Sequence, residues 1–334
     1  MNGDFIWRDA GRTVVFRRNG VAQATQLLRE HEFEPFDLLT TPRGLAAAPE
    51  LGAAAAGVHI VPAGSVPELA ATLIETAAST SLVAFGGGRT IDVAKAVASA
   101  TGARVAAIPT TMSGAEMTRI HRLPVGSESG VASMVRPALV VADPAAMTSQ
   151  PEAELRASAM NALAHGADSL YTPFANPVSE MTALRGAELI STSLDQRREE
   201  RSPAPLALGS LLCGYAIDSA MFGLHHVICQ TLVRVCGTPH AETNAAILPR
   251  ALALLLARVP DRLVDFVAAI ATDPEDVEAR VLELGGNPPG LGALGGDRDR
   301  LGSALDSMIA RPELAFMPDP PDRAELEQLI ESAW

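Results

Sequence analysis

Histidines gather in one stretch of this 334-residue chain, where four of the seven fall between positions 165 and 240. Asn161 and His165 stand four residues apart, so in a helix they share one face. His225, His226 and His240 follow further along. Imidazoles that arrive on neighbouring helices can meet at one point, where they bind a metal ion or an anion, or move a proton. Hydrogen-bonded core histidines are the alternative that spacing alone leaves open.

A glycine-rich turn connects an apolar run, 82–85, to a predicted helix. Glycines there let backbone N–H groups approach a phosphate, and the helix N-terminus adds a favourable dipole. The pattern is not the GxGxxG fingerprint, and a steric need for glycine is the alternative. Lysine occurs once in the chain, within that helix, which favours the nucleotide interpretation. The candidate residues are Gly86, Gly87, Gly88, Arg89, Thr90, Asp92 and Lys95.

Hydroxyl side chains follow the next apolar run, 105–108. The carboxyl ends of parallel strands are where open α/β sheets bind their ligands. A single Thr or Ser there is commonly just a helix cap, but four close together favour a binding loop. These four are Thr110, Thr111, Ser113 and Thr118.

The residue composition differs between the two halves of the chain, and each half predicts different elements to position these residues. Up to about residue 145, short β-branched runs alternate with helical stretches, which predicts a parallel sheet covered by helices. From 151 onward, Ala-, Leu- and Met-rich segments predict helices only. We therefore expect an α/β Rossmann-like N-terminal domain, 1–148, and an all-α C-terminal domain, 149–334. The predicted strands are 13–16, 36–41, 58–61, 82–85, 105–108 and 138–142.

Composition excludes several classes of function. The 39 acidic and 26 basic residues give a net charge of −13, so we expect no nucleic-acid partner. The longest apolar run, 251–257, is too short for a bilayer, and the N-terminus does not read as a signal peptide. Three cysteines without metal-type spacing fit a reducing compartment. We expect a cytoplasmic protein with no membrane partner.

Taken in order, the motifs resemble the iron-type (group III) alcohol dehydrogenase superfamily. They are GGGRTIDVAKA, IPTTMSGAEMT, MNALAH at 160–165, GLHHVICQTL at 223–232 and TPHAETNAAILP at 238–249. Asn161, the HHxxC order at 225–229 and the PHAET segment resemble the maleylacetate reductase branch most. The likeness extends over almost the whole chain and implies the dehydroquinate synthase-like fold of that superfamily.

The resemblance also implies an oxidoreductase that uses NADH or NADPH. The three glycines would hold the cofactor's pyrophosphate, and Thr110 and Thr111 would contact it near the nicotinamide. Thr40, Thr41 and Pro42 end the second predicted strand, where the superfamily reads the adenosine ribose. An acidic residue there would repel a 2′-phosphate and favour NADH. These residues are neutral, so the choice between NADH and NADPH stays open.

The superfamily's metal ion is held by one Asp and three His. The matching positions are Asn161, His165, His226 and His240. Because Asn replaces the only anionic ligand, affinity for Fe or Zn should fall. Members of the branch are thought to work without metal, so we expect none here. A metal-dependent alcohol dehydrogenase is the alternative.

The implied reaction is hydride transfer to the conjugated double bond of maleylacetate, which gives 3-oxoadipate in the degradation of aromatic compounds. Negative charge then develops on the ketone oxygen, where fixed hydrogen-bond donors stabilise the transition state. His165, His226 and His240 are the candidates for this oxygen or for the carboxylates. The dianionic substrate also needs cations. Their candidates, chosen by charge and location, are Arg119, Arg122 and Arg136.

Three departures from the family pattern keep other functions open, and one of them is Val233 and Arg234 in place of two glycines. Gln230 stands where the family has a second histidine, and it cannot carry a proton. The 127–137 loop is mostly neutral where the family is basic. The alternatives are a related reductase or alcohol dehydrogenase that acts on another carbonyl or unsaturated acid, possibly in biosynthesis; a nucleotide-binding protein without catalysis; and, last, a lyase of the dehydroquinate synthase type. In each case we expect a small-molecule ligand and a homodimer.

Overall fold

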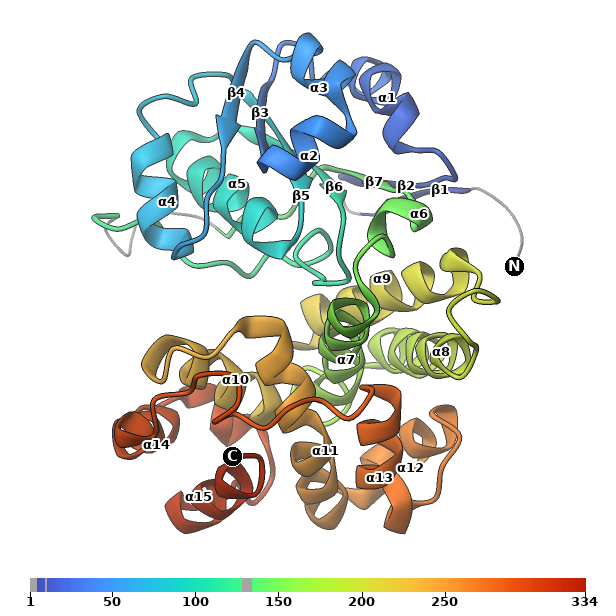
Figure 1. The fold of residues 1–334 in the computed structure, drawn as a ribbon, viewed down its shortest axis with the longest axis vertical. Helices are drawn as coiled ribbons and strands as arrows, with labels where there is room; N and C mark the ends of the chain where they lie inside the picture. Colours follow the sequence, from blue (N-terminus) through green and yellow to red (C-terminus); the bar gives the residue numbers. More distant parts are fainter. Residues whose placement is uncertain (1–4, 10, 128–133) are drawn as a thin grey trace. The chain divides into compact units, whose positions relative to one another are not determined.

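In the computed structural model the described residues are 5–9, 11–127 and 134–334. The chain divides into two compact units, Met1–Gln150 and Pro151–Trp334 (Figure 1). We call them the first and the second unit.

The first unit is built on one sheet of seven strands in the described chain, in the order β1-β2-β7-β6-β5-β3-β4. β1 pairs antiparallel with β2, and all other neighbours are parallel. Short apolar or β-branched runs predicted six of the seven strands, and β3, β5 and β7 are buried along their whole length, as expected for the inner strands of a parallel sheet. The strands are β1 Phe5–Asp9, β2 Arg12–Phe16, β3 Asp37–Thr40, β4 Gly57–Ile60, β5 Ser81–Gly86, β6 Arg104–Pro109 and β7 Leu139–Ala142.

Helices cover both faces of this sheet, and β5 shows how the residues divide between them. Val83 and Phe85 belong to one apolar cluster, together with Leu28 of α1. Leu82 belongs to the other, together with Ile91 of α5. This alternation follows from the two-residue period of a strand. The helices are η1 Val21–Gln23, α1 Ala24–Glu30, α2 Pro42–Ala47, α3 Pro49–Ala54, α4 Val66–Leu73, α5 Gly88–Thr101 and α6 Pro144–Met147.

The second unit is helical throughout its described length. α7 is central, since its residues from Ala157 to Asp168 are all buried. Proline occupies the first turn of α8, α9 and α12, where its missing N–H costs nothing. The helices are α7 Glu152–Asp168, α8 Pro177–Leu194, α9 Pro203–Ala220, α10 Leu224–Val235, α11 His240–Arg258, α12 Pro260–Ala269, η2 Pro274–Asp276, α13 Val277–Leu284, η3 Arg298–Arg300, α14 Leu301–Ile309, η4 Pro312–Phe316 and α15 Arg323–Ser332.

The predicted fold class is confirmed, and the elements that sequence reasoning missed are short. α2 and α3 are six residues each and are separated by Ala48 alone, and each begins with a proline, so the sequence of this segment resembles a loop. α13 has eight residues and follows an exposed acidic turn. β1 gains its backbone partners only by pairing with β2.

No single helix in the described chain is long and apolar enough to cross a membrane. One pair, α9 with α10, meets the length and composition only when both are taken together, and it is bent by 97°.

Candidate functional site

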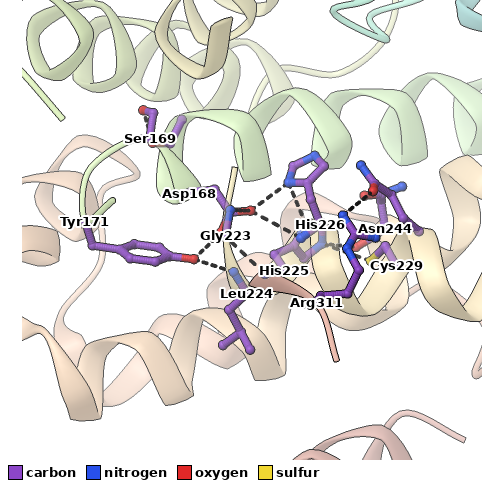
Figure 2. A network of polar contacts seen from close by, with 12 residues as sticks. Asp168, Ser169, Tyr171, Gly223, Leu224, His225, His226, Cys229, Asn244 and Arg311 are labelled. Carbon is purple, nitrogen blue, oxygen red and sulfur yellow. Dashed lines mark hydrogen bonds and ion pairs between the residues drawn. The ribbon is translucent and has the colours of Figure 1, made fainter. Parts of the chain in front are cut away.

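Asp168, at the end of α7, is the centre of a buried polar network in the second unit (Figure 2). Its carboxylate accepts five hydrogen bonds, and four of the donors belong to the first turn of α10 or the residue before it. The backbone N–H groups of Gly223 and His226 lie 3.1 and 3.2 Å from Oδ2. A carboxylate at this place satisfies N–H groups that a helix start leaves unpaired, and it complements the helix dipole.

The same carboxylate orients the ring of His226. Nδ1 of His226 lies 2.8 Å from Oδ2 of Asp168. Because an ionised carboxylate can only accept, Nδ1 carries the proton of this bond and Nε2 is left at the other side of the ring. Within the described chain no hydrogen-bond partner of His226 Nε2 is found, although the atom is buried. A buried uncommitted nitrogen is what a ligand-binding imidazole requires.

His165 brings a second imidazole to this place from α7. Its ring stacks on that of His226, with centroids 4.8 Å apart and planes inclined by 16°. His165 Nδ1 is also buried without a hydrogen-bond partner among the described residues. Asn161 lies one helical turn earlier on the same helix and is buried as well.

His225 has a different role from its neighbour. It is fully buried, and its Nε2 lies 3.2 Å from the backbone oxygen of Asn244, so this nitrogen donates. The Sγ atom of Cys229 lies 3.5 Å from the same nitrogen. His240 begins α11 and is exposed, and the Asn244 side chain lies 3.5 Å from its Nε2. His225 thus joins α10 to α11, beneath the pair formed by His165 and His226.

Burial and mutual charge set the protonation of these groups. Burial would raise the pKa of Asp168, but the hydrogen bond and charge of His226 outweigh it and hold the pKa well below 3.8. Burial, and then the charges of His226 and His225, hold the pKa of His165 well below 6.5. Burial likewise lowers the pKa of His225 to about 3. At neutral pH the network therefore contains one carboxylate and at least two neutral imidazoles.

Tyr171 also binds the first residues of α10, through its hydroxyl group. Its hydroxyl donates to Asp168 Oδ1 at 2.7 Å and accepts from the N–H of Leu224 at 2.6 Å. Burial, followed by the charge of Asp168, raises the pKa of Tyr171 well above 10, so the hydroxyl keeps its proton. A Cβ atom at Gly223 would lie 2.2 Å from that oxygen. Glycine is required there because the tyrosine hydroxyl occupies the space.

The Asp168 carboxylate and the His225 ring are committed to other contacts, so they are poor ligands for the superfamily's metal. In the described chain, the one group of three His, Cys, Asp or Glu residues with ligand atoms all within 4.8 Å of one another is Asp168, His225 and His226. Both oxygens of Asp168 already accept hydrogen bonds, and Nε2 of His225 donates to a carbonyl. The three predicted histidine ligands do not form such a group, and Asn161 brings no charge.

Gln230 does not join the histidines but contacts a cation. Its Oε1 accepts from Nη2 of Arg311 at 3.2 Å. The guanidinium of Arg311 also lies 5.6 Å from the centroid of the Phe222 ring, and that ring lies 6.1 Å from the ring of His226. Gln230 stands four residues after His226 in α10, so the two side chains share a helix face.

In the first unit, the glycine-rich turn and the hydroxyl loop lie against each other. A Cβ at Gly87 would lie 2.9 Å from Thr111 Cγ2, and one at Gly88 would lie 2.7 Å from Ser113 Cβ. A Cβ at Gly86 would likewise meet Thr90. Only glycine permits so close an approach of the two segments.

This turn also leaves polar groups available. α5 has no side-chain cap at its N-terminus, and Arg89 in its first turn is exposed. Thr110 donates its backbone N–H to Gly86 at 3.0 Å. Thr111 Oγ1 is buried, with no hydrogen-bond partner among the described residues. An open helix N-terminus, a glycine cradle and an unused hydroxyl fit a phosphate-containing cofactor.

Lys95 is fully buried, and its ammonium binds the protein itself. Nζ donates to Asp92 at 2.9 Å, to the carbonyl oxygens of Ala115 and Ile120 at 3.1 and 2.8 Å, and lies 3.4 Å from Thr118 Oγ1. Three protons are thereby fully used. Lys95 holds the loop that follows β6 against α5.

The polar side chains at the end of β3 make hydrogen bonds to nearby backbone groups. The Thr40 hydroxyl donates to the carbonyl of Phe85 at 2.8 Å, and Thr41 caps α2 by accepting from Gly44 N at 3.0 Å. Pro42 follows as the first residue of that helix. These residues shape the turn between β3 and α2.

The predicted substrate cations lie in the first unit. Arg119 and Arg122 are exposed on the loop after β6, and Arg136 is partly buried before β7. Within the 127–137 loop, residues 128–133 lie outside the described residues.

Sequence reasoning missed Asp168, Tyr171 and Arg311. A signal existed for Asp168, which is three residues after His165 and seven after Asn161, on one face of α7. Arg311 gave no signal, because it meets Gln230 across 81 residues of sequence.

Comparison with known proteins identifies the family to which this chain and its fold are similar. The family model for the C-terminal part of Fe-containing alcohol dehydrogenases matches residues 156–334, and the model for iron-containing alcohol dehydrogenase matches 15–151. The crystal structure of maleylacetate reductase from Rhizobium sp. strain MTP-10005 aligns with a TM-score of 0.82 at 27% identity, covering 100% of this chain and 99% of that one. The fold and the site thus define an oxidoreductase of the alcohol dehydrogenase class.

Curated relatives show which branch of this class of oxidoreductases the chain resembles. A maleylacetate reductase from Rhizobium sp. is 30% identical, over 99% of this chain and 97% of its own length. Maleylacetate reductase 1 from Rhodococcus opacus is 32% identical, over 80% and 77%. The chain belongs to the iron-containing alcohol dehydrogenase family, in its maleylacetate reductase branch.

Proposed function

We propose that this protein uses NADH or NADPH to reduce the carbon–carbon double bond of maleylacetate, an unsaturated oxo-dicarboxylate. The observation that carries the proposal is the Asp168–His226 pair, which leaves a buried imidazole nitrogen uncommitted beside His165. The maleylacetate reductases named above support the choice of substrate.

The first unit is proposed to bind the cofactor. The N-terminus of α5 with Gly86, Gly87 and Gly88 would take the pyrophosphate, and Thr111 has a hydroxyl to offer. Ser113 and Thr110 complete the loop. Asp92, Lys95 and Thr118 would act indirectly, by fixing that loop to α5. When bound, the nicotinamide supplies the hydride.

The adenosine end is proposed to accept both cofactors. In the turn after β3, the hydroxyl groups of Thr40 and Thr41 already make local hydrogen bonds. Neither they nor Pro42 carries a negative charge that would repel a 2′-phosphate.

In the second unit His226 is proposed to stabilise charge on the substrate ketone. Hydride addition to the carbon β to the ketone moves the π electrons toward the ketone oxygen and forms an enolate. A protonated His226, held by the Asp168 carboxylate, would donate from Nε2 to that oxygen. A proton then adds to the carbon α to the ketone, which gives 3-oxoadipate.

Neutral His165 is proposed as a second hydrogen-bonding group for this oxygen, and His240 as a flanking one at the start of α11. The substrate's carboxylates need cations, for which Arg119, Arg122 and Arg136 are the proposed partners in the first unit. No step in this scheme requires a metal ion, because the proposed hydrogen bond from Nε2 of His226 stabilises the charge on the enolate oxygen. The proposed working form is a homodimer, which sedimentation of the purified chain tests.

The experiment is steady-state oxidation of NADH and of NADPH with freshly prepared maleylacetate. We expect turnover by the wild type and a loss of about 10²- to 10³-fold in kcat for His226→Gln, the range for removal of one hydrogen-bond donor to a developing oxyanion. His31→Gln, in the first unit, is the matched control and should keep wild-type kinetics. A wild type that leaves maleylacetate unreduced with either cofactor would refute the proposal.

A further inference from the structure

Arg311 is a cation beside the histidine network to which no role has been given so far (Figure 2). It precedes η4, and its side chain is only 17% exposed. Burial of an arginine to this degree is costly unless its N–H groups have partners or await one.

Two nitrogens of the Arg311 guanidinium donate hydrogen bonds to side chains of the protein, and the third can donate to a ligand. Nε donates to Glu313 Oε2 at 2.9 Å, and Nη2 donates to Gln230 Oε1 at 3.2 Å. A guanidinium has five N–H groups. In the described chain no hydrogen bond to Nη1 is found, so two N–H groups there and one on Nη2 can bind an anion. Glu313 takes the Nε edge, away from Nη1.

Gln230 explains why the cation can sit at this place. A protonated histidine at position 230 would repel the guanidinium, whereas the amide oxygen of glutamine accepts a hydrogen bond without a charge of its own. Glutamine at position 230 is therefore compatible with the guanidinium of Arg311 beside it.

The surroundings direct the guanidinium toward the reacting part of the site. Phe222 is buried, and its ring centroid lies 5.6 Å from the guanidinium and 6.1 Å from the ring of His226. Gln230 and His226 are one helical turn apart on α10, which is about 5 Å. Because the guanidinium and the imidazole both approach the same phenyl ring, one short oxo-diacid can reach Arg311 with a carboxylate and His226 with its ketone oxygen.

We propose that Arg311 binds one carboxylate of the substrate and so selects dicarboxylates over neutral enones. The inference rests on the proposed function for the identity of the substrate. Charge-assisted, fork-like contacts of arginine with carboxylate are among the strongest hydrogen bonds in proteins.

The test compares wild type, Arg311→Met, Arg311→Lys and the control Arg185→Met, whose arginine is exposed and paired with Glu188 on α8. With maleylacetate we expect KM to rise about 10- to 100-fold in Arg311→Met, with a smaller change in kcat and an unchanged Kd for NADPH. Arg311→Lys should lie between, because it keeps the charge and loses the fork. Arg185→Met should match the wild type.

Binding of maleate by calorimetry gives a readout that needs no turnover. The affinity of Arg311→Met for maleate should fall by about the same 10- to 100-fold as its KM for maleylacetate rises. If the KM for maleylacetate and the Kd for maleate of this variant both stay within twofold of the wild-type values, the inference is overturned. If the wild type fails to reduce maleylacetate, the proposed function is wrong, and maleate binding alone then decides the role of Arg311. Arg311→Gln replaces the Met variant if that protein does not fold.

Discussion

At the scale of single residues, the site depends on Asp168. One buried carboxylate satisfies the first N–H groups of α10, accepts from Tyr171 and fixes the ring of His226. Structural and chemical roles therefore coincide in one side chain. A carboxylate with this many donors stays ionised, and it stabilises a positive charge on the adjacent imidazole.

Asp168→Asn tests this double role. The amide keeps the shape, but its NH₂ group faces N–H donors, and Nδ1 of His226 loses its anionic acceptor. We expect a loss of about 3–5 kcal/mol in the free energy of unfolding and of at least about 10²-fold in kcat. Tyr171→Phe is the control, which should cost about 1–3 kcal/mol with a smaller effect on kcat. Denaturant unfolding and steady-state kinetics measure both, and an Asp168→Asn variant with wild-type kcat would contradict the role of the pair.

Residue types and the family resemblance together indicated His165 and His226, because histidines gather in one stretch of the chain and these two match ligand positions of the family. They could not indicate the partners. Asp168 meets His226 across 58 residues and Arg311 meets Gln230 across 81, and only the packing of α7, α10 and η4 brings them together.

At the scale of elements, α5 and the loop that follows β6 form one assembly in the first unit. Lys95 connects them by three hydrogen bonds, which its ammonium group donates to Asp92 and to the carbonyl oxygens of Ala115 and Ile120. Glu116 lies inside the same loop, fully buried, and neither carboxylate oxygen has a hydrogen-bond partner among the described residues. Burial raises the pKa of Glu116 from 4.5 to about 7, although the charges of Lys95 and Arg12 oppose the shift.

This shift predicts how stability depends on pH. Between about pH 4.5 and 7 the folded state holds the Glu116 proton and the unfolded state does not, so stability falls as pH rises through that window. Above it, the buried carboxylate costs on the order of 3 kcal/mol. Glu116→Gln removes this titration, so its stability relative to wild type should rise by about that amount from pH 5 to pH 8.

Urea unfolding of Glu116→Gln at the two pH values measures the effect, with Glu50→Gln as an exposed control of the same charge change. An advantage for Glu116→Gln that is equal at pH 5 and pH 8 would show that the carboxyl does not titrate in this window.

Elements differ in how well the sequence predicted them. The strands β2 to β7 were predicted because each contains a short apolar or β-branched run. β5 and β7 are buried along their whole length, whereas the residues of β4 alternate between partly buried and exposed. The long helices of the second unit were predicted because their Ala-, Leu- and Met-rich segments contain hardly any cluster of β-branched residues. Short elements such as α2 and α3 could not be predicted, since six residues carry too little periodicity.

At the scale of the whole molecule, the two units supply different chemistry. The first has a parallel sheet with a glycine-rich turn at the start of α5, and the second has buried imidazoles oriented by a carboxylate. The family of the chain was evident from its motifs, because those motifs are the turns and helix faces that such chemistry requires. Substrate preference was not, since it depends on contacts such as that of Gln230 with Arg311.

The central claim, reduction of an enone by conjugate hydride addition without a metal, is tested most directly by the fate of the hydride. NADH or NADPH with both C4 hydrogens replaced by deuterium is mixed with maleylacetate and chelator-treated protein, and the product is analysed by NMR and mass spectrometry. We expect 3-oxoadipate with one deuterium on the carbon β to the ketone, at a rate that chelation leaves unchanged. Deuterium on a newly formed alcohol carbon, or a reaction that stops with chelator and resumes with Fe or Zn, would contradict the account.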